Sequence, residues 1–185
     1  MRVLAISGSL RAASYNTALL RAAAELAPQH VDIEFYEGLE SLPPYNEDRD
    51  TDRPPAAVTE LRQAIAEADA VLFATPEFNG SMPGQLKHAV DWASRPYGSD
   101  AALWGKPVAV VGASVTDYGA VWAQDHLRKA LGIAGARVVD LDLPLGKAPD
   151  HFDADGILIN PEFRDRLAEV VDGLVHSHEH LAAAA

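Results

Sequence analysis

The chain has 185 residues and 48% hydrophobic content, which fits one domain with a full hydrophobic core. Its 15 basic and 27 acidic residues give a formal charge of −12, which disfavours binding to nucleic-acid phosphates or to anionic membrane surfaces. The absence of cysteine excludes disulfides, thiolate nucleophiles, iron–sulfur clusters and cysteine zinc sites. Any redox chemistry must therefore come from a bound cofactor.

Five short apolar or β-branched runs predict strands, each separated from the next by helix-like or loop material. The runs that begin at Val3, Val71 and Val108 are continuously apolar, as expected for strands covered on both faces of a parallel sheet. We therefore expect these three strands to be central. In chain order, the predicted strands cover residues 3–7, 31–36, 70–75, 107–114 and 137–141.

The segments between and after these strands have helix-forming composition, with apolar residues spaced three and four apart. The alternation of strand and helix predicts a doubly wound α/β fold with right-handed crossovers. Five strands of this length favour a flavodoxin-like, three-layer αβα sandwich with a parallel sheet in the order 2-1-3-4-5, which binds ligands at the carboxyl ends of the strands. The predicted helices cover residues 16–27, 56–68, 84–94, 119–131 and 161–176.

Residues 37–55 are predicted to form a long, proline-punctuated loop, and loops of this length in a compact domain are often functional. The first apolar run is too short for a signal peptide, and no stretch approaches the ~20 apolar residues of a membrane-spanning helix. We expect a cytoplasmic protein with one domain over residues 1–178 and a disordered tail over residues 179–185. The three histidines within residues 176–180 do not share one helical face, so we expect no metal site.

The turn after the first strand concentrates small and hydroxyl side chains where a helix begins, and such a helix start favours an anion. Arg11 adds a positive charge there. The alternative is that Ser14 or Asn16 only caps the helix. The arginine and the number of hydroxyl groups favour a phosphate site. The side chains that can donate hydrogen bonds to phosphate oxygens are Ser9, Ser14, Asn16 and Thr17.

The same turn lacks both Gly-x-Gly-x-x-Gly and a Walker lysine motif, which disfavours a classical NAD or ATP fold. A phosphatase loop of similar shape would need a nucleophilic cysteine, and the sequence has none. The turn is therefore predicted to hold a phosphate group without cleaving it.

Two further loops leave the carboxyl ends of predicted central strands and should lie beside this turn. Residues 75–84 follow the third strand, although an Asn-Gly pair and Pro83 also suit an ordinary connection from strand to helix. Residues 112–119 follow the fourth strand, and they are also compatible with a helix-capping turn in which Thr116 or Asp117 is the cap. Both loops are predicted to face the ligand crevice.

Two motifs together resemble the NADPH-dependent FMN reductase family, which includes quinone, chromate and azo-dye reductases. The first is Gly-Ser-Leu-Arg-x-x-Ser-x-Asn, which begins at Gly8. The second is Pro-Glu-Phe-Asn-Gly-Ser-x-Pro-Gly-x-Leu-Lys-His-Ala-x-Asp-Trp over residues 76–92, and its length makes it highly specific. The resemblance extends in order from the first strand to at least Arg128. The chain departs from the family pattern at Phe78, where tyrosine is frequent, and at His88, where asparagine is common.

The resemblance implies a bound FMN, with its phosphate in the turn after the first strand and its isoalloxazine ring against the two other loops. Backbone N–H groups near N5 and the N1–C2=O edge would stabilise the charge of the reduced flavin, so no catalytic side chain is required. The implied phosphate residues are Ser9, Arg11, Ser14, Asn16 and Thr17. The implied ring residues are Pro76, Glu77, Phe78, Asn79, Gly80, Ser114, Tyr118 and Gly119.

The resemblance also implies a ping-pong reaction in which NADPH or NADH transfers hydride to flavin N5, and an acceptor then takes the electrons at the same face. Quinones are the preferred acceptor class, beside azo compounds, chromate and free flavin, and a homodimer or homotetramer is expected. Glu77 is interpreted as a hydrogen-bond acceptor or as a partner for a neighbouring subunit's cation rather than as a general base. Two alternatives share the fold: an electron-transfer flavoprotein without pyridine-nucleotide oxidation, and a flavin-binding sensor without turnover.

Overall fold

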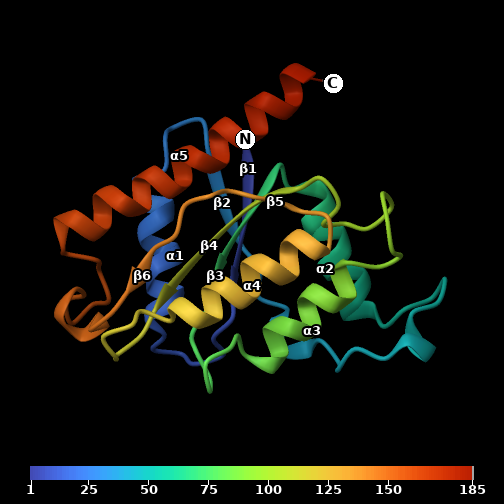
Figure 1. The fold of residues 1–185 in the computed structure, drawn as a ribbon, viewed down its shortest axis with the longest axis horizontal. Helices are drawn as coiled ribbons and strands as arrows, with labels where there is room; N and C mark the ends of the chain where they lie inside the picture. The colour runs from blue at the N-terminus through green and yellow to red at the C-terminus, as the bar shows by residue number, and fades with distance from the viewer. Residues whose placement is uncertain (185) are drawn as a thin grey trace.

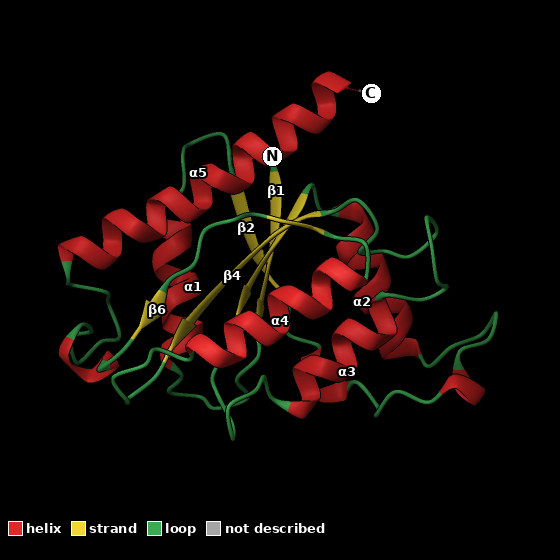
Figure 2. Cartoon of the chain, viewed as in Figure 1, coloured by secondary structure: helices red, strands yellow, loops and turns green. Residues whose placement is uncertain are grey.

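A computed structural model describes residues 1–184, and it has a central sheet with helices on both faces (Figures 1 and 2). Its strands are β1 (Arg2–Ser7), β2 (Asp32–Phe35), β3 (Ala70–Ala74), β4 (Pro107–Ala113), β5 (Arg137–Val138) and β6 (Pro144–Leu145). The strands pair in parallel in the order β2-β1-β3-β4-β5, and β6 pairs with the carboxyl end of β4. The flavodoxin-like fold and the strand order predicted from the sequence are confirmed.

The helices form the two outer layers, and the side-chain alternation of the strands explains which helix covers which face. Val3 and Ala5 of β1 lie in one hydrophobic cluster, and Leu4 and Ile6 lie in the other, because successive side chains of a strand point to opposite faces. The first cluster contains residues of α1 (Tyr15–Leu26) and α5 (Pro161–Ala184). The second contains residues of α2 (Ala56–Glu67), α3 (Gly84–Ala93) and α4 (Val121–Ile133).

The three strands predicted to be central are central. Every residue of β3 and β4 is buried, and so is the apolar part of β1 from Val3 to Ile6. The edge strand β2 is mostly exposed, which agrees with its mixed polar sequence. The continuous apolar runs therefore identified the strands whose ends build the ligand-binding edge of the sheet.

The fifth strand is shorter than predicted. We expected a strand over residues 137–141, but β5 ends at Val138 and the chain rejoins β4 only at β6. The guanidinium of Arg128 on α4 donates to the carbonyl oxygens of Val139 and Leu141 at 2.9 and 2.7 Å, and it pairs with Asp140 at 3.0 Å. Arg128 therefore binds the carbonyl groups just beyond the point where the ladder ends.

Residues 179–184, for which the sequence predicts a disordered tail, continue α5 as a regular helix in the structure. Alanine and leucine are strong helix formers, and His178 and Leu181 lie against a surface pocket at the end of the sheet that also includes Trp104 and Lys106. Residue 185 lies outside the described residues. Among residues 1–184, no helix is long and apolar enough to cross a membrane.

The long loop between β2 and α2 is fastened to α3 rather than free. Gln85 donates to the carbonyl oxygens of Leu39 and Leu42 at 2.7 and 2.8 Å, and the buried Trp92 donates its indole N–H to the carbonyl of Pro43 at 2.9 Å. His88 accepts a hydrogen bond from the Tyr45 N–H at 3.2 Å, which also holds the loop on α3. The loop therefore contributes a fixed wall beside the carboxyl edge of the sheet.

Candidate functional site

The three loops singled out in the sequence meet at the carboxyl ends of β1, β3 and β4. Ser7 pairs with Ala74, and Ala74 pairs with Val111, so each loop leaves the sheet one ladder away from the next. The N–H of Gly8 donates to the carbonyl of Ala74 at 2.7 Å. A Cβ at Gly8 would lie 2.7 Å from Cδ2 of the buried Leu86, so a larger residue would displace that side chain.

The phosphate loop, defined as residues 8–14, carries backbone donors that the rest of the protein does not use. Within the described residues, the N–H groups of Leu10, Ala12 and Ala13 have no hydrogen-bond acceptor. These groups precede α1 and lie at the positive end of its dipole, where an anion is stabilised. This donor set fits a phosphate group.

Two predicted phosphate residues also have structural roles. Ser14 caps α1, because its Oγ accepts a hydrogen bond from the Thr17 N–H at 3.3 Å, so the capping alternative holds for this residue. Asn16 is buried, and its side-chain amide makes two hydrogen bonds with the backbone of Ala113, at 2.9 and 3.0 Å. Asn16 therefore crosslinks α1 to the end of β4, a role that the sequence did not predict.

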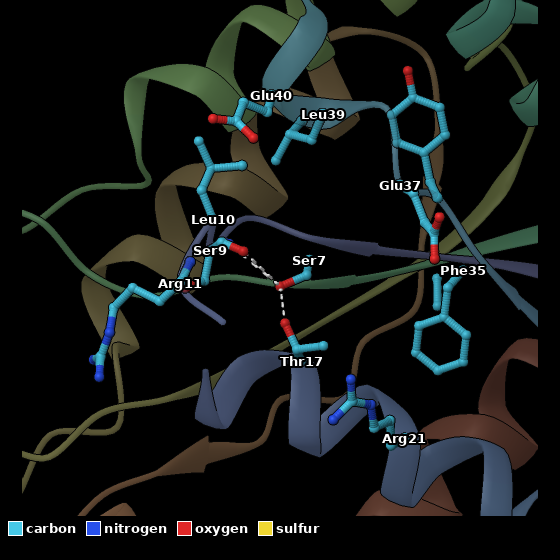
Figure 3. Close-up of a pocket in the computed structure, with 12 residues that line it drawn as sticks. Ser7, Ser9, Leu10, Arg11, Thr17, Arg21, Phe35, Glu37, Leu39 and Glu40 are labelled. Atoms are coloured by element: carbon cyan, nitrogen blue, oxygen red, sulfur yellow. Dashed lines mark hydrogen bonds between the residues drawn. The ribbon is translucent and has the colours of Figure 1, made fainter. Parts of the chain in front are cut away.

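A pocket of about 420 Å³ lies against the phosphate loop on the side of β2 (Figure 3). Ser7 and Thr17 share a hydrogen bond of 2.8 Å at its base, and Arg11 and Arg21 are among its lining residues. None of the predicted ring residues lines this pocket, so it lies beside the loop that is predicted to hold the phosphate.

Tyr36, another lining residue, has a buried hydroxyl group without a hydrogen-bond partner in the described part of the chain. Burial raises the pKa of Tyr36 to about 12, and the negative charge of Glu60 acts in the same direction. The hydroxyl therefore stays protonated at neutral pH and adds no charge to the wall of the pocket.

The ring turn, defined as residues 77–81, is a tight hairpin after β3. Phe78 and Ser81 exchange two backbone hydrogen bonds of 2.9 and 3.2 Å, and Asn79 and Gly80 between them have φ values of 53° and 72°. This is the left-handed pair that an Asn-Gly sequence favours. Within residues 1–184, the N–H groups of Glu77, Asn79 and Gly80 have no acceptor, and nothing lies within 4 Å of a Cβ placed at Gly80.

The third loop is held from the side of β6. The Ser114 N–H donates to the carbonyl of Leu145 at 3.0 Å, and Gly119, at a φ of 58°, packs so closely on Pro144 that a Cβ would overlap its backbone. Tyr118 is 60% exposed and its ring lies 4.9 Å from that of Trp122. Open donors and exposed aromatic rings at the end of a parallel sheet suit a flat, polar-edged ring.

The match to known proteins agrees with this geometry. A family model described as NADPH-dependent FMN reductase matches residues 1–150. The chain belongs to the NADPH-dependent FMN reductase family. This confirms the family resemblance found in the two sequence motifs.

Individual members of the FMN reductase family are similar to nearly the whole chain. An NAD(P)H-dependent FMN reductase of Pseudomonas aeruginosa is 41% identical over 175 residues, covering 94% of this chain and 93% of that protein. A 2-hydroxy-1,4-benzoquinone reductase of Burkholderia sp is 39% identical over 181 residues, covering 93% of each. The solved structure of a flavoenzyme NAD(P)H:(acceptor) oxidoreductase from Paracoccus denitrificans matches with a TM-score of 0.84 at 35% identity over 97% of each chain.

Three residues of α4 contact the ring turn or the third loop, and the sequence analysis did not include them among the candidate site residues. Ala123 donates its N–H to Glu77 at 3.2 Å, Gln124 donates to the carbonyl of Gly119 at 2.9 Å, and His126 contacts Ser81 at 3.2 Å. The interpretation of Glu77 as a hydrogen-bond acceptor is confirmed within the chain. The signal that the sequence offers is Gln124, a polar residue three and seven positions before Leu127 and Leu131 in the helix predicted over residues 119–131.

Proposed function

We propose that this chain binds FMN and uses it to transfer electrons from NAD(P)H to a quinone-type acceptor. The observation that carries the proposal is the juxtaposition of two sets of free backbone donors, one in the phosphate loop and one in the ring turn, in a member of the FMN reductase family. When bound, FMN supplies the two-electron redox chemistry that connects the two substrates.

In this proposal the phosphate loop holds the charged end of the cofactor. The free N–H groups of Leu10, Ala12 and Ala13 bind phosphate oxygens, and Arg11 adds positive charge at the exposed side of the loop. Asn16 acts mainly by holding α1 against Ala113. The proposed phosphate residues are Ser9, Arg11, Ser14, Asn16 and Thr17.

The ring turn and the third loop bind the isoalloxazine ring. The free N–H groups of Glu77, Asn79 and Gly80 can donate to the polar edge of the ring, and such donors stabilise negative charge that develops there during reduction. No side chain is required to take up a proton. The proposed ring residues are Pro76, Glu77, Phe78, Asn79, Gly80, Ser114, Tyr118 and Gly119.

A flat aromatic acceptor fits the surface next to the ring turn. Phe78, Tyr118 and Trp122 are 59%, 60% and 46% exposed, and aromatic faces of this kind stack on planar rings. Relatives of the chain are named quinone reductases and NAD(P)H:quinone oxidoreductases, which supports a quinone as the acceptor class.

We also propose that the chain forms a homodimer or homotetramer and acts in the cytoplasm, where its reductant is available. Ile133 of α4 is 66% exposed beside an apolar surface pocket of about 450 Å³ that includes Met82 and Ala130. An exposed apolar surface of this kind commonly marks a protein–protein contact. Sedimentation equilibrium of the purified chain tests the assembly, and a monomer at all concentrations would contradict it.

The first test of the function is an absorption spectrum of the purified protein, followed by release of the cofactor and reconstitution with FMN. Anaerobic mixing of the reconstituted protein with NADPH or NADH should bleach the flavin absorbance, and a quinone should restore it. A protein that cannot be reconstituted with FMN would refute the proposal. Flavin binding without bleaching would instead indicate an electron carrier, and bleaching without steady-state NADPH consumption would indicate a sensor.

A further inference from the structure

Helix α4 begins without a side-chain cap of its own. The residue at its N-cap position is Ala120, at a φ of 61°, and an alanine side chain cannot accept a hydrogen bond. The first turn of any helix leaves N–H groups that need acceptors from elsewhere. Here the carboxylate of Glu77 accepts from the Ala123 N–H at 3.2 Å, although the two residues are 46 positions apart.

The cap of α4 is thus supplied by the ring turn, and two further contacts bind the same part of α4 to the site. The ring of His126 and the hydroxyl of Ser81 lie 3.2 Å apart, at the other end of the ring turn. Gln124, which is 1% exposed, donates to the carbonyl of Gly119 in the third loop at 2.9 Å. Residues 123–126 of α4 therefore contact both loops that line the proposed ring site.

We propose that Glu77 is a positioning residue for the flavin ring. Its hydrogen bond to α4 fixes the place from which the free N–H groups of Asn79 and Gly80 meet the ring. This inference rests on the proposed function. It gives Glu77 no role as a base, and it requires no cation from a neighbouring subunit.

In this proposal, the reach of the Glu77 side chain, rather than its charge, is what the flavin site requires. Glutamine is as long as glutamate and also presents an oxygen acceptor, so Glu77→Gln should keep the bond to Ala123. Aspartate keeps the charge but is one methylene shorter, so Glu77→Asp should lose the bond. Glu77→Gln therefore keeps the hydrogen bond without the charge, Glu77→Asp keeps the charge without the hydrogen bond, and Glu77→Ala removes both.

The test measures dissociation constants of FMN and riboflavin and the midpoint potential of the bound flavin. Glu77→Ala and Glu77→Asp should raise the dissociation constants of FMN and of riboflavin about 5- to 10-fold. This factor corresponds to the ~1 kcal/mol of a lost helix cap. The factor should be the same for FMN and riboflavin, because the change lies at the ring and not at the phosphate. The midpoint potential should shift in these two variants and stay at the wild-type value in Glu77→Gln, which should bind both flavins within about twofold of wild type.

Glu25→Ala is the matched control, because Glu25 is an exposed glutamate of α1 without a side-chain hydrogen bond among residues 1–184. Wild-type flavin affinity and potential in Glu77→Ala would overturn the proposal, even if the apoprotein were less stable, because the hydrogen bond would then serve the fold alone. An equal loss in Glu77→Gln and Glu77→Ala would also overturn it, because the charge would then be the active feature. If the wild-type chain itself fails to bind FMN, the proposed function is overturned. The wild-type measurement therefore separates that outcome from a failure of the Glu77 proposal alone.

Discussion

Replacing Asn16 tests whether the site is built on a crosslink between α1 and β4. In Asn16→Ala, the N–H and the carbonyl oxygen of Ala113 both lose their side-chain partner in a buried position. Each lost hydrogen bond is worth about 1 kcal/mol, and each orphaned buried group costs about 1–3 kcal/mol. Allowing for partial relaxation, we expect the free energy of unfolding to fall by about 2–4 kcal/mol, or a Tm decrease of about 5–15 °C.

The assay is urea unfolding of the apoprotein, followed by FMN titration of the folded variant. The slope of the transition should stay unchanged, so the loss appears as a lower midpoint. Gln63→Ala is the control, because Gln63 donates a hydrogen bond to Glu67 on the exposed surface of α2 and its loss should cost less than about 0.5 kcal/mol. A loss below about 1 kcal/mol in Asn16→Ala would refute the crosslink as a stabilising element.

Three other changes address separate parts of the site. Arg11→Ala should raise the FMN dissociation constant about tenfold and leave that of riboflavin unchanged, because the proposed partner of Arg11 is the phosphate, which riboflavin lacks. Equal effects on the two dissociation constants would contradict this proposed role. Gly119→Ala should lower the free energy of unfolding by more than about 2 kcal/mol, because the new Cβ meets a left-handed φ and overlaps the backbone of Pro144. In the same urea assay the control Gly132→Ala, within α4, should stabilise the protein by up to about 1 kcal/mol. Tyr36→Phe should stabilise the protein by about 1 kcal/mol at pH 7 by removing an orphaned hydroxyl. Because burial raises the pKa of Tyr36 to about 12 in the fold, ionisation of its hydroxyl lowers the stability of the wild type as the pH rises from about 10 toward 12. The phenylalanine variant cannot ionise there, so it should lose less stability over that window.

The sheet could be predicted from the sequence because burial on both faces leaves a local signature. The continuous apolar runs of β1, β3 and β4 indicate central strands, because a strand covered by helices on both faces needs apolar side chains at every position. The end of β5 could not be predicted in this way. Residues 137–141 have the composition of a strand, but in the fold the carbonyl groups of Val139 and Leu141 bind Arg128, a side chain on a different element.

In the candidate site, too, features set by the local sequence could be predicted, and contacts between residues far apart in the chain could not. Local signals identified the loops: hydroxyl side chains in the first, an Asn-Gly pair in the second, and for all three a place directly after a predicted central strand. The ties between the loops join side chains to backbone groups far along the chain, as Asn16 does with Ala113 and Glu77 does with Ala123. A backbone N–H has no sequence signature, so such partners become visible only in the folded chain.

The ties between the loops have a consequence for how a cofactor would enter. Asn16, Glu77 and Gln124 hold the loops through contacts within the chain, so the proposed site is formed before FMN binds. Binding to such a preformed site requires no ordering of the chain. The observed association rate of FMN should therefore rise linearly with its concentration without a plateau, and the heat-capacity change on binding should reflect only the apolar surface of the ligand and its walls.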